Sequence, residues 1–168
     1  YDKVYTITLT DSIGQVNASI THPIQASGIN ITGAGQTICV LDTGINYTHE
    51  SFGGCDNDTF LNGSCEKIPG GHDFVNNDLD PVDDNGHGTH VSGTIAAKQN
   101  NNIGIAGIAS NAKIMGIRAV PNNGDETDVD VAESFLYAAK HGAKIINCSF
   151  GKSRNEGGNL IKDTINYI

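Results

Sequence analysis

The sequence has no apolar run near the roughly 20 residues that a membrane-spanning helix requires. Basic residues are also scarce: 10 lysines and arginines stand against 19 aspartates and glutamates, which gives a net charge of -9. This balance argues against nucleic acid or a membrane surface as a partner, and it suits cationic substrates or divalent cations. The chain begins at Tyr1 without an initiator methionine or a signal peptide, which indicates a processed or excised segment.

Aromatic residues make up only 6% of the chain. Four tyrosines form no stripe that could stack on bases or sugars, and we interpret them as packing residues: Tyr5, Tyr47, Tyr137 and Tyr167. With 168 residues the chain is long enough for one domain with a sizeable core, because such a chain buries roughly 70% of its unfolded surface.

Only four cysteines are present, in two kinds of surroundings. Cys55 and Cys65 enclose a polar loop, which favours a disulfide that stabilises the fold by roughly 2–3 kcal/mol. A disulfide would place the protein in an oxidising compartment, so we expect it to be secreted or extracellular. Two free thiols are the open alternative. Cys39 and Cys148 lie inside apolar runs and are predicted to be small buried core residues.

Three short apolar runs are rich in β-branched residues, at positions 37–42, 113–120 and 144–150. Each is too short for a helix and is apolar on successive positions, which is typical of a strand buried on both faces. Residues 43–86 are instead rich in glycine, aspartate and asparagine, which predicts loops.

Helical patterns alternate with these strands. Residues 90–98 are rich in small side chains, and a longer helix is predicted between Thr127 or Asp128 as N-cap and Gly142 as its end. Its predicted core face consists of Val129, Ala132, Phe135, Leu136 and Ala139. A last helical pattern places on one face Leu160, Ile161, Thr164, Ile165 and Ile168. The alternation predicts a three-layer α/β fold, a mainly parallel sheet flanked by helices, and the missing strand after the last helix indicates that the chain ends mid-domain.

Two residues are candidates for a catalytic pair. Functional side chains of α/β sheets gather at the carboxyl ends of strands. Asp42 ends the run at 37–42, and His87 starts a helix after a loop long enough to return to that edge. A carboxylate beside an imidazole N–H fixes the tautomer and stabilises the imidazolium that forms on proton transfer. The pattern therefore predicts that Asp42 supports His87 as a general base, with a nucleophile further along the chain.

Zinc is the main chemical alternative for this region. His87 and His90 stand three apart in "HGTH", and further ligands could come from His72 and Asp73 or from His49 and Glu50. Zinc needs three or four ligands. Neither set reproduces a familiar zinc spacing, and Gly88 weakens the helical turn that such a pair prefers.

Two blocks then carry a resemblance to a known family. "VLDTGI" (40–45) and "NGHGTHVSGTIAA" (85–97) resemble the aspartate and histidine signatures of the subtilisin-like serine proteases. "INCSFG" (146–151) resembles that family's substrate-cleft segment, and residues 101–120 resemble its next loop and strand. The resemblance implies a serine endopeptidase that needs no redox or organic cofactor.

The resemblance assigns roles residue by residue. Asp42 matches the catalytic aspartate and His87 the general base, whereas His90 matches a helix position that packs below the site. The two walls of the substrate cleft are matched by Gly124, Asp125, Glu126, Ser149, Phe150 and Gly151. A calcium-binding loop is matched by Asn101, Ile103 and Ile105. Ser51 stands where many subtilisins have a calcium-binding aspartate, which weakens the expectation of a calcium site of that type.

The sequence also departs from the family. The catalytic serine block, a Gly-Thr-Ser followed by a small-residue helix, is absent, and so is the oxyanion-hole asparagine. Ser92 lies in the histidine helix, Ser149 belongs to the cleft wall and Asn147 precedes it, so none of them replaces these groups. Because a base without a nucleophile cannot perform acyl transfer, the chain alone is predicted to be inactive. The alternatives are a non-catalytic peptide-binding pseudo-protease or truncated module, and one half of a nicked chain.

The implied organisation is a peptidase domain whose N-terminal part is residues 17–168, preceded by a lead-in or propeptide remnant at 1–16. Its implied partners are polypeptide substrates, a propeptide inhibitor and the C-terminal part of the domain. Four acidic residues near the cleft suggest a preference for basic side chains upstream of the cleaved bond: Asp83, Asp84, Asp125 and Glu126.

Overall fold

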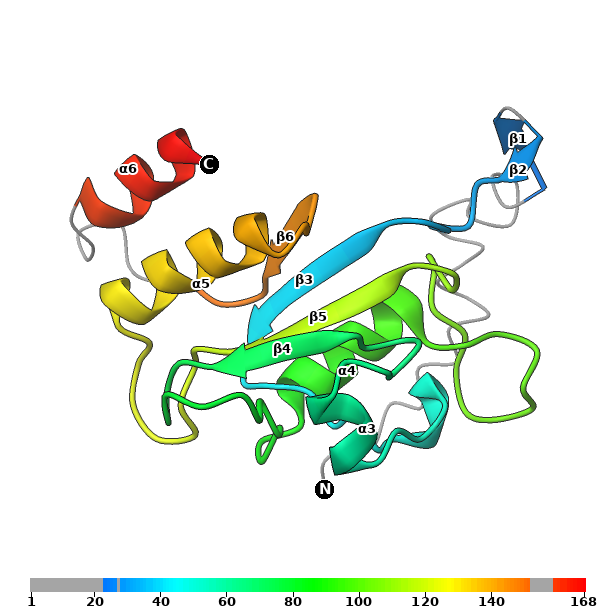
Figure 1. The fold of residues 1–168 in the computed structure, drawn as a ribbon, viewed down its shortest axis with the longest axis horizontal. Helices are drawn as coiled ribbons and strands as arrows, with labels where there is room; N and C mark the ends of the chain where they lie inside the picture. The colour runs from blue at the N-terminus through cyan, green and yellow to red at the C-terminus, as the bar shows by residue number, and fades with distance from the viewer. Residues whose placement is uncertain (1–22, 27, 152–158) are drawn as a thin grey trace, which may run out of the picture.

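The computed structural model describes residues 23–26, 28–151 and 159–168. Its centre is a parallel sheet with the strand order β4-β5-β3-β6. The strands are β3 (Thr37–Asp42), β4 (Gly70–Asp73), β5 (Lys113–Arg118) and β6 (Ile145–Cys148). A short antiparallel hairpin of β1 (Gln25–Ala26) and β2 (Ile29–Asn30) lies at one end of the molecule (Figure 1). The predicted lead-in, residues 1–16, lies outside the described residues.

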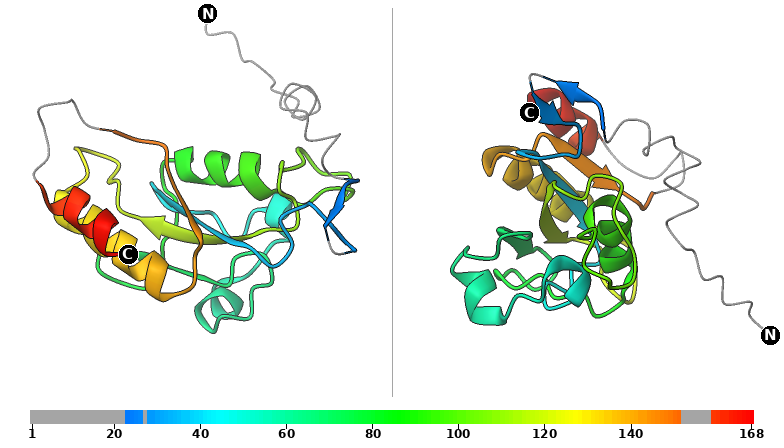
Figure 2. Two further views of the ribbon diagram at one scale, coloured as in Figure 1. Left: turned by 90° about the horizontal axis from the view of Figure 1, so that it is seen from above. Right: turned by 90° about the vertical axis from the view of Figure 1, so that its right-hand side faces the viewer.

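Helices cover both faces of the sheet. Figures 1 and 2 show α4 (His87–Ala96) on one face and α5 (Asp128–Lys140) on the other. The last helix, α6 (Asn159–Tyr167), packs against α5. Two short elements precede α4: η1 (Glu50–Phe52) and α3 (Asn57–Leu61). The predicted three-layer α/β architecture is confirmed. None of the helices in the described ranges is both long and apolar enough to cross a membrane.

Strand β3 lies at the centre of both core layers. Ile38 and Val40 belong to the cluster on the α4 side, whereas Cys39 and Leu41 belong to the cluster on the α5 side. All four side chains are buried, because β3 has a neighbouring strand on each edge and a helix over each face. The continuous apolar run at 37–42 is therefore a strand buried on both faces, as predicted.

Helix α4 begins at His87, as predicted, and continues through the small residues that follow position 90. Its buried face consists of Gly88, Ser92, Gly93 and Ala96. These small side chains let the helix axis approach the sheet closely. A Cβ on Gly88 would collide with the backbone oxygen of Gly44 and would stand 3.1 Å from the Cβ of Asp42. The glycine thus brings the first turn of α4 against the end of β3.

Helix α5 has the predicted ends but not the predicted core face. The Thr127 hydroxyl accepts a hydrogen bond from the amide of Asp130, and Gly142 adopts a φ of 86° after the last turn. The buried residues are Val131, Ala132, Ser134 and Ala138, which lie close to the sheet because they are mostly small. Val129 and Leu136, predicted to be core, are exposed. In α6 likewise Thr164 is buried, whereas three of the predicted face residues are exposed: Leu160, Ile165 and Ile168.

Strand β6 corrects two further expectations. It lies at an edge of the described sheet, where Ile145 is 52% exposed and Cys148 is also exposed. A strand with only one neighbour leaves part of its apolar surface uncovered, so the run at 144–150 is not buried on both faces and Cys148 is not a core residue. Cys39, on the central strand, is fully buried as predicted.

The glycine-rich region after β3 is more ordered than predicted. It contains η1, α3 and β4, whereas its glycine, aspartate and asparagine content predicts loops throughout. A disulfide joins Cys55 and Cys65 on either side of α3. Phe60 of α3 stacks on Tyr47, with ring centroids 4.2 Å apart, and both rings are buried. The stapled loop is thus part of the core on the α4 side.

Candidate active site

Asp42 and His87 meet at the carboxyl edge of the sheet. Asp42 is the last residue of β3 and is 1% exposed. Its Oδ1 lies 2.7 Å from Nδ1 of His87, the first residue of α4. The backbone amide of Thr43 donates to the same Oδ1 at 2.7 Å. The structure therefore brings together the two side chains that the sequence predicted as a pair, although 45 positions separate them.

The geometry of this pair fixes how the imidazole can act. A carboxylate can only accept, so Nδ1 donates its N–H to Asp42 and the opposite nitrogen, Nε2, carries the lone pair. The His87 side chain is 50% exposed, whereas Asp42 is buried beneath it. Nε2 can therefore take a proton from a group outside the described residues, and the buried carboxylate would stabilise the resulting imidazolium.

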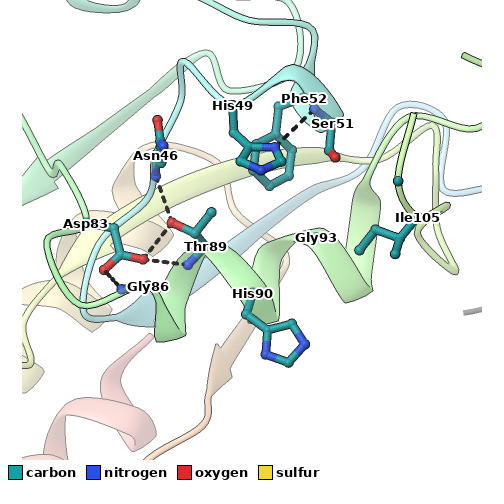
Figure 3. Close-up of a pocket in the computed structure, with 11 residues that line it drawn as sticks. Asn46, His49, Ser51, Phe52, Asp83, Gly86, Thr89, His90, Gly93 and Ile105 are labelled. Carbon is teal, nitrogen blue, oxygen red and sulfur yellow. Dashed lines mark hydrogen bonds between the residues drawn. The ribbon is translucent and has the colours of Figure 1, made fainter. Parts of the chain in front are cut away.

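A hydrogen-bond network around Asp83 holds the first turn of α4 in place. Gly86, at the N-cap position, offers no side chain, and Asp83 supplies the missing acceptor by receiving bonds from the amides of Gly86 and Thr89 at 2.8 Å each. The Thr43 hydroxyl donates to Asp83 at 2.9 Å and accepts from the amide of Gly88 at 2.9 Å. Figure 3 shows the bonds from Gly86 and Thr89 to Asp83.

These bonds also keep Asp83 ionised. Burial raises the pKa of this carboxyl, but the hydrogen bonds from Thr89, Gly86 and Thr43 outweigh burial and hold the pKa below its usual value. The charge faces the amino end of α4, where the helix dipole favours an anion. Asp83 thus connects β3, through Thr43, to the helix that carries His87.

Arg118 is a second organising residue that the sequence reasoning missed. It is the register partner of Asp42 on the neighbouring strand β5, and it is 8% exposed. Its guanidinium donates to Asp73 at 2.9 Å and to both oxygens of Asp84, at 3.1 Å and 3.0 Å. Asp73 is 1% exposed. The carboxyl edge therefore holds a row of buried charges on three adjacent strands, of which only Asp42 carried a motif.

The two segments predicted as cleft walls follow strands that pair with β3. Strand β6 pairs with β3 up to Leu41 and Cys148, so residues 149–151 leave the sheet beside Asp42. Ser149 and Gly151 are exposed, and Ser149 accepts a hydrogen bond from the Asn147 side chain at 2.9 Å. Residues 124–126 follow β5, the neighbour on the other side. The two segments thus follow the strands that flank β3 on its two edges.

Members of these walls differ in exposure. Gly124 and Asp125 are exposed, and Gly124 adopts a φ of 102° that favours glycine. Phe150 is half-buried and packs on the α5-side cluster. Glu126 is only 8% exposed. Gly124, Asp125, Ser149 and Gly151 therefore remain open for contact with a ligand.

The acidic cleft that was expected to select basic substrates is not formed as predicted. The Asp83 carboxylate accepts hydrogen bonds from the first turn of α4, and the Asp84 carboxylate is paired with Arg118. Glu126 is buried, which leaves Asp125 as the one exposed acid of the four that is not engaged in these contacts. Two of the charges have a structural role because helix α4 and Arg118 need acceptors there.

His90 does not lie where the sequence predicted, and the other histidines have no shared ligand site in the described part of the chain. His90 is exposed on α4 rather than packed below the site, and Figure 3 shows its ring directed away from Asp83 and Thr89. His49 uses Nδ1 to accept from the amide of Ser51, and His72 stacks on Phe74 at 4.4 Å. Among the described residues, no group of three or more histidines, cysteines and acids could hold a metal ion.

Cys148 is a potential nucleophile near Asp42. Although the residue is exposed, burial of its thiol and the negative charge of Asp42 raise its pKa to about 11. A thiol with that pKa is almost fully protonated at neutral pH. It therefore holds little of the thiolate, the form in which a cysteine attacks.

The predicted calcium loop fits the ion poorly. The side-chain oxygen of Asn101 already accepts from the amide of Ile103 at 3.1 Å. The Ser51 hydroxyl faces this loop, since it would lie 3.6 Å from a Cβ on Gly104. Calcium binds six to eight oxygens and favours carboxylates. Residues 99–105 carry no acidic residue, and Ser51 contributes only a neutral hydroxyl.

Comparisons relate this chain to known proteins. A sequence model described as the Subtilase family matches residues 33–168. The "Thermophilic serine proteinase" of Bacillus sp. (strain AK1) is 47% identical over 118 residues, which cover 70% of this chain and 26% of that protein. Thermitase of Thermoactinomyces vulgaris is 39% identical over 135 residues, which cover 80% of this chain and 43% of thermitase.

Solved structures have the same fold. The crystal structure of a cold adapted subtilisin-like serine proteinase matches with a TM-score of 0.64 and 32% identity, covering 86% of this chain and 46% of that one. MycP1 with the N-terminal propeptide removed matches with a TM-score of 0.66 at 24% identity, covering 94% of this chain and 43% of that one. The chain spans less than half the length of each of these relatives.

Proposed function

This chain belongs to the subtilase family, and from that premise we propose that it supplies the aspartate and the histidine of a serine endopeptidase. The observation that carries this proposal is the 2.7 Å contact between Nδ1 of His87 and the buried Asp42 carboxylate at the carboxyl edge of the sheet. The sequence holds no Gly-Thr-Ser block. We therefore place the attacking serine and the oxyanion-hole asparagine in a segment outside this sequence.

The geometry supports a sequence of proton transfers. The serine oxygen attacks the peptide carbonyl carbon, and its proton passes to Nε2 of His87 as the C–O bond forms. Asp42, bound to Nδ1–H, stabilises the imidazolium. Nε2 then gives the proton to the departing amine as the C–N bond breaks, which leaves an acyl-enzyme that water hydrolyses through the same base.

The substrate is proposed to be an extended polypeptide held between the two segments beside Asp42. Residues 124–126 would accept the peptide as an added strand, and residues 149–151 would form the opposite wall. The exposure of Gly124, Asp125, Ser149 and Gly151 supports this placement. No redox or organic cofactor is needed for these steps.

The proposed setting is an oxidising one. The disulfide between Cys55 and Cys65 supports secretion or an extracellular location, because such bonds persist outside the reducing cytosol. The proposed partners are the C-terminal part of the peptidase domain and an inhibitory propeptide, besides the polypeptide substrate.

The proposal is tested by comparing this chain with a complete domain that adds the missing segment. The complete domain is expected to cleave a peptide amide and to be labelled by a fluorophosphonate at one serine, whereas this chain alone is expected to show no turnover. Recovery of activity on mixing this chain with its separately expressed complement would indicate a nicked enzyme. A complete domain that binds extended peptides without cleaving or being labelled would instead indicate the non-catalytic peptide-binding module.

Calcium is proposed to bind the loop at Asn101, Ile103 and Ile105 only weakly, because the loop offers carbonyl and amide oxygens as ligands but no carboxylate. Removing trace calcium with EDTA is expected to leave the melting temperature unchanged. Ser51→Asp adds a carboxylate facing the loop, and we expect it to create a calcium-dependent rise in Tm of several degrees at millimolar calcium. Ser51→Asn is the matched neutral control. A large loss of Tm with EDTA in the unaltered protein would contradict the weak-binding proposal.

A further inference from the structure

Three lysines gather at the edge of the sheet opposite the Asp42–His87 pair. Lys67 precedes β4, Lys98 follows α4 and Lys113 begins β5, so all three lie near the amino ends of the strands. They line one pocket of about 290 Å³ together with a single acidic residue, Glu66. In a chain with net charge -9 and only 10 basic residues, this pocket concentrates positive charge.

The innermost lysine is held by backbone carbonyls. Lys67 is 6% exposed, and its Nζ donates to the oxygens of Ser110 and Ala112 at 2.6 Å each. Burial, together with the positive charge of Lys98, lowers the pKa of Lys67 to about 8, although the negative charge of Glu66 acts in the opposite direction. The two carbonyls are thereby occupied, so the groups left to face a ligand are mainly donors.

Ser110 and Asn101 add further hydrogen-bond donors to the pocket. Ser110 is 4% exposed, and its hydroxyl has no hydrogen-bond partner among the described residues. Asn101 uses its side-chain oxygen within its own loop, which leaves its amide N–H groups as donors. The Lys98–Glu66 contact is loose, at 3.5 Å, and the Glu66 side chain is 85% exposed. Glu66 therefore neutralises the lysines only partly.

We infer that this pocket binds a small tetrahedral oxyanion, inorganic phosphate or sulfate. An anion between Lys67 and Lys98 would separate two like charges and accept from the donors that the pocket leaves unused. A compact ammonium acts as a point charge and does not require the planar geometry of a carboxylate, which suits a tetrahedral anion. The site is independent of the proposed peptidase chemistry, because it lies at the other end of the strands.

Binding is measured by isothermal titration calorimetry with sodium phosphate, sodium sulfate and sodium chloride at equal ionic strength. Saturable binding of one phosphate or sulfate is expected, without saturable binding of chloride. Lys98→Met keeps the aliphatic stem but removes the charge, and it should weaken the affinity about tenfold. Lys140→Met, at the exposed end of α5, removes the same charge outside the pocket and should leave the affinity unchanged.

A nuclear magnetic resonance titration of the lysine side chains gives a second readout. Phosphate is expected to raise the pKa of Lys67, because a bound anion favours the charged ammonium. If Lys98→Met does not fold, Ser110→Ala replaces it, with an expected threefold loss of affinity. The inference is overturned if phosphate and sulfate bind no better than chloride, or if Lys98→Met and Lys140→Met change the affinity equally.

Discussion

Replacing His87 by alanine in the complete peptidase domain is expected to lower kcat by roughly 10⁶-fold. Without the imidazole, nothing takes the proton of the attacking serine, while Asp42 stays buried and cannot reach it. This loss in kcat equals the one known for removal of the catalytic histidine of subtilisin, a member of the same family. Asp42→Asn should cost roughly 10⁴-fold, because an amide can donate to Nδ1 and stabilise the wrong tautomer.

The measurement is kcat on a peptide amide, with circular dichroism to establish that each variant is folded. His90→Ala is the matched control, because it removes an exposed imidazole from the same helix α4. It is expected to change kcat by less than about threefold, since the ring has no part in the proposed proton transfer. If His87→Ala and His90→Ala had similar kcat values, the proposed role of the Asp42–His87 pair would be wrong.

Replacing Arg118 by methionine is expected to destabilise the fold by about 3–5 kcal/mol. The substitution removes the guanidinium from the Asp73 carboxylate, which is 1% exposed and, within the described ranges, then accepts hydrogen bonds only from Asn76. A buried carboxylate that loses its cation retains its desolvation cost without the compensating attraction. Chemical denaturation monitored by circular dichroism measures the change in the free energy of unfolding.

An exposed ion pair provides the control for this prediction. Glu66→Gln removes the charge that lies 3.5 Å from Lys98. The Lys98 side chain is 38% exposed and the Glu66 side chain 85% exposed, so the substitution should destabilise the fold by less than about 1 kcal/mol. Adding Asp73→Asn to Arg118→Met removes the unpaired charge, so the double variant should be more stable than Arg118→Met alone. A loss for Arg118→Met as small as that for Glu66→Gln would show that the buried pair does not stabilise the fold.

Local sequence patterns were sufficient for much of the architecture. The run that forms β3 is apolar at every position between Thr37 and Asp42, and Thr127 and Gly142 mark the ends of α5 by their chemistry alone. Strand β4, "GGHD", could not be predicted in this way, because its place in the sheet depends on pairing with β5 rather than on its own side chains. The predicted core face of α5 was wrong for a similar reason. Periodicity identifies an apolar stripe on a helix, but it does not identify which face of the helix packs against the sheet.

In the candidate site, too, some residues could be predicted from local sequence and others depend on the tertiary structure. Asp42 and His87 could be found from the sequence, because each lies in a short block whose residue types carry the chemistry. Thr43, Asp83 and Arg118 could not be assigned their roles, since each has a hydrogen-bond partner 34 to 45 positions away that only the fold brings near. Lys67, Lys98 and Lys113 likewise have no common motif. Parallel strands placed in register bring such distant residues to one edge, and that register depends on the packing of α4 and α5 against the sheet.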